Sequence, residues 1–385
     1  MGGLYERVVP APRDIGRTPL SWANDADADW LARLALDHTL GAVSLRRALF
    51  LDLETTGLGG GTGNVPFLVG AATFGADGNA RLVQWWLRDL DDEPVMLERL
   101  RPIMEGAELF VSYNGKSFDL PVLRNRFLMN GLDAPPGRPH LDLLHLARRV
   151  HKGRPFRKSL TDLEREVLGF VRSHDVAGEE VARRYLAYLR HRDATSLGEV
   201  VVHNERDLWS LVALMGRYGA PLDRLALEDL PWLARCVRRA GDLPRAACVA
   251  REAVARGGGL EALRVQGEVA KARGAKDQAL NAFEAAERLA VALRDDSVAG
   301  TVALAEIRFE LCKLYEHHRR DPHAALRLLE RSAAGAWAEP AAATAHRRAR
   351  LARKIATAST TAPRRSGRAR LRRPADPLAS ERRLS

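Results

Sequence analysis

The sequence has few cysteines and no long apolar segment, and each absence excludes a class of protein. None of the 3 cysteines among 385 residues lies in a Cys-x-x-Cys pair. We therefore expect neither a disulfide framework nor a cysteine-based zinc site, and we predict a reducing, cytoplasmic environment. No run approaches the roughly 18 apolar residues that a membrane-spanning helix needs. Residues 1–14 show no signal-peptide pattern.

Acidic residues are scarce in one part of the chain only. Residues 338–385 hold 13 Lys or Arg against 3 Asp or Glu, which accounts for +10 of the net charge of +11. This segment also lacks apolar periodicity, so it is predicted to be a basic, largely disordered tail. Such an arm favours nucleic acid through phosphate contacts, and a solubilising tail is the alternative.

The first half of the chain shows strand and helix signals in an α/β order. Residues 1–41 are interpreted as an N-terminal extension with one short helix, and residues 42–220 as one domain. Apolar runs and a turn signal predict strands, and longer periodic segments predict helices. The predicted strands are residues 48–55, 67–74, 80–87 and 108–113, and the predicted helices are residues 93–105, 117–130 and most of 141–216.

The second half contains a helical repeat. Residues 239–257 resemble residues 271–290 with a period of 33, which aligns Ala246 with Ala279, and a weaker copy places Ala325 equivalently. A period near 34 is typical of tetratricopeptide-like helical pairs, and a plain bundle with alanine-rich faces is the alternative. We predict an all-α tetratricopeptide-like region over residues 228–337, which could bind a protein partner.

Carboxylates gather at the end of the first apolar strand. Asp52 and Glu54 are two residues apart, so both side chains point to one face of the strand. Like charges on one face repel each other unless a cation lies between them, and Mg²⁺ prefers oxygen ligands. The apolar residues around them argue against an exposed edge strand.

Two further motifs carry candidate functional residues. Asp119 lies near the start of a predicted helix that has Ser117 at its N-cap, where an acid also complements the helix dipole. His203 and Asp207 are four residues apart on a predicted helix and therefore share a face. Each motif alone is weak evidence for a functional site, because surface histidines and acids in the first turn of a helix are common.

Together these residues resemble a known family. DLETTGL, NGKSFD and the His203–Asp207 pair are similar, in that order, to the three exonuclease motifs of the DEDD superfamily of RNase H-like proteins. The match is closer to the YprB-like family of RNase H-like domains, and it covers about residues 48–215. The supporting passages are FLDLETTGLGGGTGN, VSYNGKSFDLPVLRNR, HLDLLHLARR, SLTDLEREVLGFVR and VVHNERDLWSLVAL. The resemblance implies an RNase H-like mixed sheet with flanking helices, followed by a tetratricopeptide-like region.

The resemblance also implies an activity and a site. It implies a 3′–5′ exonuclease that hydrolyses phosphodiester bonds of DNA or RNA with two ions of Mg²⁺ or Mn²⁺. His203 would orient or deprotonate the attacking water. The matched metal-binding carboxylates are Asp52, Glu54, Asp119 and Asp207. The matched nucleic-acid-binding residues are Thr55, Thr56, Gly57, Asn114 and Lys116.

One spacing departs from the family pattern. His203 lies four residues before Asp207, which is the spacing of the branch with Tyr, whereas the branch with His uses five. Which proton His203 transfers is therefore left open. Asp142, a further acid in a matched passage, is interpreted as supporting the site. The alternatives to a nuclease are an inactive nucleic-acid-binding module and a scaffold that recruits proteins through its repeats.

Overall fold

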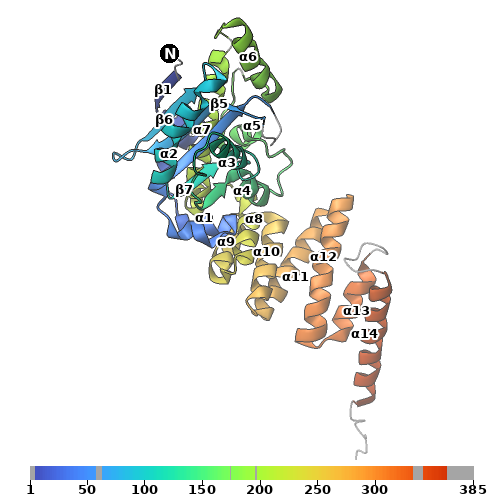
Figure 1. Ribbon diagram of the computed structural model, residues 1–385. Coiled ribbons are helices and arrows are strands. Elements are labelled where there is room, and N and C mark those ends of the chain that lie inside the picture. Colours follow the sequence, from blue (N-terminus) through green and yellow to red (C-terminus); the bar gives the residue numbers. More distant parts are fainter. Residues whose placement is uncertain (1–4, 58–62, 174, 196, 333–340, 362–385) are drawn as a thin grey trace, which may run out of the picture. The chain divides into compact units, whose positions relative to one another are not determined.

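The apolar run at residues 48–55 forms the central strand of a six-stranded mixed sheet in a computed structural model of the chain (Figure 1). The structure describes residues 5–57, 63–173, 175–195, 197–332 and 341–361. The chain divides into two compact units, residues 1–293 and 294–385. In the described part, no helix is long and apolar enough to cross a membrane.

The sheet has the strand order β1-β6-β5-β4-β7-β8. The strands are β1 (Tyr5–Pro10), β4 (Ala48–Thr55), β5 (Pro66–Phe74), β6 (Ala80–Trp86), β7 (Leu109–Ser112) and β8 (His140–Asp142). Neighbouring strands from β1 to β4 are antiparallel, and β4, β7 and β8 are parallel. A separate two-stranded ribbon consists of β2 (Asp14–Ile15) and β3 (Thr18–Pro19).

Strands β1 and β8 were missed by the sequence analysis. β1 lies in the segment interpreted as an N-terminal extension, but it pairs with β6 and forms one edge of the sheet. β8 has three residues and lies where nearly continuous helix was expected. Neither strand has a periodic signal of its own, because pairing with a partner distant in sequence defines both. The predicted strands at residues 48–55, 67–74, 80–87 and 108–113 are confirmed to within two residues.

Helices cover both faces of the sheet, and each face has its own apolar core. Phe50 belongs to one core together with residues of α1, α4 and α7, while Leu49 and Leu51 belong to the other with residues of α2, α3 and α6. The helices are α1 (Ala28–Ala35), α2 (Glu93–Gly106), α3 (Asp119–Met129), α4 (Leu143–Val150), α5 (Leu160–Leu163), α6 (Gly178–His191) and α7 (Leu197–Tyr218). A π-helical turn, η5 (Glu164–Leu168), continues α5. Because side chains alternate along β4, Asp52 and Glu54 share the face of Phe50, toward α7.

The second half is helical. α8 (Leu230–Arg239), α9 (Leu243–Ala255), α10 (Gly259–Ala272) and α11 (Lys276–Leu293) complete the first unit. Ala246 and Ala279, which the 33-residue period aligns, are both fully buried, one on α9 and one on α11. Ala325 is also buried, on α13 of the second unit. Small residues at these positions allow close helix packing, and the tetratricopeptide-like assignment stays a prediction.

The second unit corrects the expectation of a largely disordered tail from residue 338. It contains α12 (Val298–Leu314), the π-helical turn η8 (Tyr315–Arg319), α13 (Pro322–Arg331) and α14 (Ala341–Thr361). Leu351 of α14 is fully buried in a small core with Cys312 and Leu329. Apolar packing therefore orders α14 despite its many arginines, and the basic residues after 361 lie outside the described residues.

A buried glutamate holds the basic face of α14. The carboxylate of Glu316 lies 3.2 Å from Arg347 Nη1, 2.8 Å from Arg350 Nε and 2.8 Å from Lys354 Nζ. Burial alone would raise the pKa of Glu316, but the hydrogen bonds from Arg350 and Lys354 outweigh it and lower the pKa to about 2. The ionised carboxylate is thus the group that offsets the repulsion among these cations.

Helix α7 approaches the sheet closely at one glycine. Gly70 of β5 pairs with Asp52 of β4. A Cβ atom at residue 70 would lie 2.2 Å from Asn204 Oδ1 and 2.3 Å from Leu208 Cδ1, both on α7. No side chain fits between helix and strand here, so glycine sets the distance of α7 from β4.

We predict that Gly70→Ala pushes α7 away from the sheet and destabilises the protein by about 1–3 kcal/mol, as overpacking does. Thermal unfolding followed by circular dichroism measures this loss. Gly106→Ala is the matched control, because a Cβ there meets nothing within 4 Å. Equal melting temperatures for the two variants would contradict the packing role of Gly70.

We predict that Glu316→Gln weakens the attachment of α14 to the rest of the second unit, because the variant loses the charge that pairs with Arg347, Arg350 and Lys354. A folded-state pKa below the unfolded value stabilises the fold above about pH 4.5, and this contribution disappears as the pH falls toward 2. At pH 7 the variant should expose Arg347 and Lys354 to rapid cleavage in limited trypsin digestion. Glu330→Gln on α13 is the control, since Glu330 is exposed. Trypsin resistance equal to wild type would refute this role.

Candidate active site

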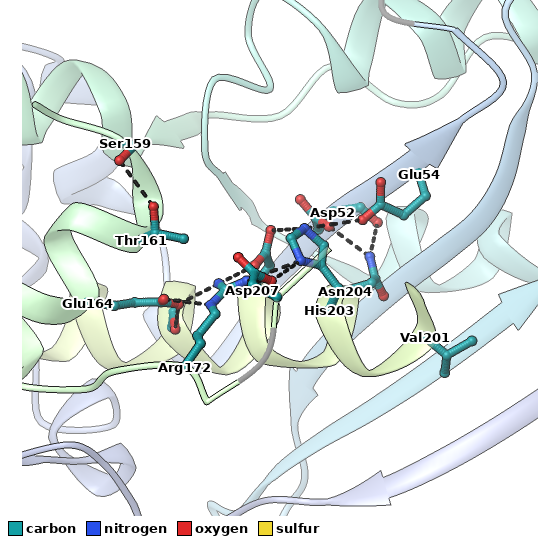
Figure 2. Close-up of polar contacts among 12 residues, drawn as sticks. Asp52, Glu54, Ser159, Thr161, Glu164, Arg172, Val201, His203, Asn204 and Asp207 are labelled. Atoms are coloured by element: carbon teal, nitrogen blue, oxygen red, sulfur yellow. Dashed lines mark hydrogen bonds and ion pairs between the residues drawn. The ribbon is translucent and has the colours of Figure 1, made fainter. Parts of the chain in front are cut away.

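Strand β4 and helix α7 bring three predicted functional side chains together. His203 Nε2 lies 3.8 Å from Glu54 Oε1 and 3.7 Å from Asp207 Oδ2. Figure 2 shows Asp52 and Glu54 extending from the strand toward the helix turn that carries His203 and Asp207. The expected shared faces, Asp52 with Glu54 and His203 with Asp207, are therefore both present.

Asn204 connects the two elements directly. Its Nδ2 donates hydrogen bonds to Asp52 Oδ2 at 2.7 Å and to the Asp52 carbonyl oxygen at 3.2 Å. Its Oδ1 accepts a hydrogen bond of 2.8 Å from Gln84 Nε2 on β6. Asn204 is fully buried, so this amide fixes the orientation of the Asp52 carboxylate.

Asp119 enters the cluster from α3, where it is the first residue and is buried. The predicted N-cap Ser117 is wrong: the N-cap residue is Phe118, and no side chain caps this end. Backbone amides, including that of Leu53 on β4, hydrogen-bond the Asp119 carboxylate. The Asp119 carboxylate therefore accepts a hydrogen bond from the first backbone amide of α3, and it also interacts with neighbouring carboxylates such as Asp207.

The turn before α3 is held by Asp142. Asp142 accepts hydrogen bonds from the backbone amides of Asn114 at 2.9 Å, Lys116 at 3.1 Å and Leu144 at 3.1 Å. Asn114 has a left-handed φ of 65°. Asp142 thus has a structural role in this turn, and its support of a functional site stays a prediction. The side chains of Asn114 and Lys116 are exposed, and their contact with nucleic acid stays a prediction.

Thr55, Thr56 and Gly57 shape the end of β4. Thr55 Oγ1 donates to the Gly57 carbonyl at 2.7 Å, Thr56 Oγ1 accepts from the Val65 amide at 3.0 Å, and the Gly57 amide donates to Asn64 Oδ1 at 2.8 Å. These bonds hold residues 55–57 against Asn64 and Val65. The glycine-rich residues 58–62 lie outside the described residues, and the nucleotide-binding role of this turn stays a prediction.

An arginine that the sequence analysis did not single out lies beside the acids. The Arg172 side chain is 4% exposed, and its guanidinium bridges Glu164, at 2.6 and 2.7 Å, to Asp207 (Figure 2). It also lies 3.0 Å from Asp175 Oδ1. Asp175 Oδ1 in turn lies 2.5 Å from His203 Nδ1. Glu164 and Arg172 both fall in the matched passage SLTDLEREVLGFVR, which was the available signal. Asp175 had none, because it lies in an irregular segment.

The cluster holds more negative charge than its cations neutralise. Burial, followed by repulsion from Asp207, Glu54 and Asp119, raises the pKa of Asp52 well above its usual value. Burial and the neighbouring acids likewise raise the pKa of Glu54. Burial raises the pKa of Asp119 to about 7. A raised pKa means that the surroundings disfavour the ionised carboxylate. Since this holds for Asp52, Glu54 and Asp119, a cation bound among them would be stabilised by their charge.

The donor set suits divalent metal ions, although it is not arranged around one. In the part of the chain that the structure describes, no group of three or more His, Cys, Asp or Glu side chains already has metal-binding geometry. Arg172 holds one oxygen of Asp207, and Asn204 holds one oxygen of Asp52. The second oxygen of each, together with Glu54 and Asp119, offers the hard ligands that Mg²⁺ and Mn²⁺ accept. The residues therefore fit such ions in chemistry.

Comparison with known proteins defines the class of this part of the chain. Residues 49–218 match the family model of the RNase H superfamily, so the predicted RNase H-like fold is confirmed. Members of that superfamily are generally hydrolytic nucleases that use divalent metals.

The proteins that are similar to the chain include a bacterial relative and an archaeal DNA polymerase. Over 183 residues it is 36% identical to the "Uncharacterized protein YprB" of Bacillus subtilis (strain 168), which covers 46% of this chain and 44% of YprB. The chain thus spans less than half of that relative's length. A family B DNA polymerase from the hyperthermophilic archaeon Pyrobaculum calidifontis aligns with a TM-score of 0.35 and 16% identity, over 50% of this chain and 29% of the polymerase.

We predict that Glu54→Gln stabilises the metal-free protein. A raised folded-state pKa means that the unfolding free energy falls as the pH rises above the usual carboxyl range. In EDTA at pH 8 the variant should melt roughly 2–4 °C above wild type, which corresponds to about 1 kcal/mol. The gain should vanish near pH 4, where the wild-type carboxyl is protonated. Glu98→Gln, at an exposed position of α2, controls for surface charge, and a lower melting temperature for Glu54→Gln at pH 8 would contradict the model of uncompensated charge.

Proposed function

We propose that the protein is a metal-dependent nuclease, specifically a 3′–5′ exonuclease that hydrolyses phosphodiester bonds of DNA or RNA. The observation that carries this proposal is the convergence of Asp52, Glu54, Asp119 and Asp207 from three separate elements at one largely buried, under-neutralised position. A structural role does not explain it, because burying several uncompensated carboxylates destabilises a fold. Metal binding does explain it, and the RNase H-like fold of residues 49–218 supports it.

The four carboxylates would hold two ions of Mg²⁺ or Mn²⁺. When bound, such ions activate the attacking water and stabilise the leaving oxygen. Asp52 would be oriented for this role by Asn204, and Asp207 by Arg172. Arg172 also pairs with Glu164. The arginine would therefore keep one carboxylate partner if Asp207 bound a metal ion.

His203 would position or deprotonate the water. His203 Nδ1 lies 2.5 Å from Asp175 Oδ1 and 3.2 Å from Arg172 Nη1. An ionised Asp175 carboxylate only accepts hydrogen bonds, so it favours the neutral imidazole with its proton on Nδ1. Nε2 is then the acceptor, and it is the nitrogen that faces Glu54 and Asp207. Asp175 would thus act as a positioning residue for the His203 ring.

Nucleic acid is the proposed partner. Thr55, Thr56 and Gly57 would contact the terminal nucleotide, while Lys116 and Asn114 are exposed on the turn before α3 and would contact the strand. The helical second half would bind a protein partner or a further part of the substrate. A binding module without activity and a protein-recruiting scaffold remain the alternatives that the experiment separates.

Cleavage of end-labelled single-stranded DNA and RNA tests the proposal. With Mn²⁺ or Mg²⁺ we expect stepwise shortening from the 3′ end, with release of mononucleotides. EDTA or a blocked 3′ end should abolish the reaction, and the polymer that is degraded identifies the substrate.

Asp52→Ala should lower the cleavage rate by more than about 100-fold, because loss of a metal ligand costs more than loss of a supporting residue. Glu98→Ala, on the exposed face of α2, is the matched control and should retain full activity. Wild-type activity in Asp52→Ala would refute the site. Tight binding of nucleic acid without cleavage by the wild type would favour the binding module, and capture of one stoichiometric protein without cleavage would favour the scaffold.

A further inference from the structure

A cavity separate from the acidic cluster lies at the C-terminal end of α7. It has a volume of about 330 Å³. Its walls come from the β2–β3 turn, the segment after α4, the end of α7 and the segment that leads into α8. None of the four proposed metal-binding carboxylates lines it.

Three arginines line this cavity, Arg17, Arg154 and Arg217. Arg154 is partly neutralised, since Nη1 lies 3.5 Å from Asp229 Oδ2. Across the described ranges, neither Arg17 nor Arg217 has a carboxylate within ion-pair distance. Arg217 instead lies 5.8 Å from the ring centre of Trp22. Neither of these two guanidinium groups thus has an ion-pair partner in the described part of the chain.

The cavity wall also carries three acids, Glu166, Glu228 and Asp229, and in the described part of the chain none of them lies within ion-pair distance of Arg17 or Arg217. Asp229 is buried and uses Oδ1 to contact His151 Nδ1 at 2.8 Å, while Oδ2 faces Arg154. His151 Nε2 lies 3.0 Å from the Tyr218 hydroxyl, which closes a buried polar chain along the cavity. Glu166 pairs outward with Arg165 at 3.0 Å.

The position of Arg17 is fixed by two glycines. Its backbone amide donates to the Leu168 carbonyl at 2.7 Å, which ties the β2–β3 turn to the end of η5. Gly16 and Gly169 have left-handed φ values of 58° and 70°. A Cβ at residue 169 would lie 2.4 Å from Arg17 Nε. The turn is therefore built to hold this guanidinium against the cavity wall.

We propose that this cavity binds a small phosphate-bearing anion, with Arg17 and Arg217 as its counter-charges and Arg154 as a third donor. Guanidinium groups form paired hydrogen bonds with phosphate oxygens, and phosphate supplies the missing charge. The volume lies in the range of small-molecule sites and accommodates a ligand of mononucleotide size. Burial, together with the nearby Arg17, lowers the pKa of Arg217, which agrees with an unneutralised cluster.

Titration calorimetry on the full-length protein tests this site. The probes are inorganic phosphate, a nucleoside 5′-monophosphate and the same nucleoside without phosphate, each at constant ionic strength in chloride with EDTA. We expect saturable binding of both phosphate compounds and none of the nucleoside. Tighter binding of the 5′-monophosphate would identify a nucleotide as the ligand, and equal affinities would identify free phosphate. Absence of saturable binding for both, or equal binding of the nucleoside, would overturn the proposal.

Arg17→Gln and Arg217→Gln should each weaken phosphate binding at least about tenfold, because each removes charged hydrogen bonds. Arg251→Gln, at an exposed position of α9 outside the cavity, should bind as wild type does.

Without phosphate, Arg217→Gln should melt at or above the wild-type temperature, because it relieves repulsion between arginines. The exposed Arg17 provides a second test if that variant unfolds. Unchanged binding in both variants would overturn the site, and binding retained in Asp52→Ala separates it from the proposed nuclease centre.

Discussion

The close crossing of α7 over β4 and β5 is the contact on which the acidic site depends. Gly70 removes the side chain that would keep helix and strand apart, and Asn204 then reaches the Asp52 carboxylate at 2.7 Å. The same crossing places His203 and Asp207 opposite Glu54. The distances among the proposed functional groups thus depend on how closely the backbone of α7 lies to the backbone of the sheet.

That geometry has an electrostatic consequence. The carboxylates on β4, α3 and α7 lie in surroundings where burial raises the pKa of Asp52 and Glu54, and Arg172 lowers that of Glu54. Arg172 meets Glu164, Asp175 and Asp207 from one buried position. It therefore limits the repulsion on the α7 side, while the charge on the β4 side stays uncompensated. Such a group of acids lowers the stability of the metal-free fold, and the proposed binding of cations would offset this loss.

Arginine is used in three different ways in this chain. In the acidic site, Arg172 is buried and paired with carboxylates. On α14, Arg347 and Arg350 surround a single glutamate, Glu316, that offsets their charge. At the end of α7, Arg217 shares a cavity with Arg17 without a carboxylate partner in the described part of the chain. The net charge of +11 is therefore a poor guide to function, whereas the local balance around each guanidinium distinguishes structural ion pairs from candidate binding sites.

Local sequence signals are enough to predict part of this structure. They give strand β4 with its observed bounds, and the periods of strand and helix place Asp52 beside Glu54 and His203 beside Asp207. Other features depend on the folded chain: β1 joins the sheet, Phe118 rather than Ser117 precedes α3, and Arg172 and Asp175 contact Asp207 and His203. These features depend on contacts between residues that are far apart in the chain or lie in irregular segments. The periodicity of a local sequence cannot identify which distant residue makes such a contact. The order of α14 belongs to the same group, because burial of Leu351 and the Glu316 contacts outweigh a composition that resembles a disordered tail.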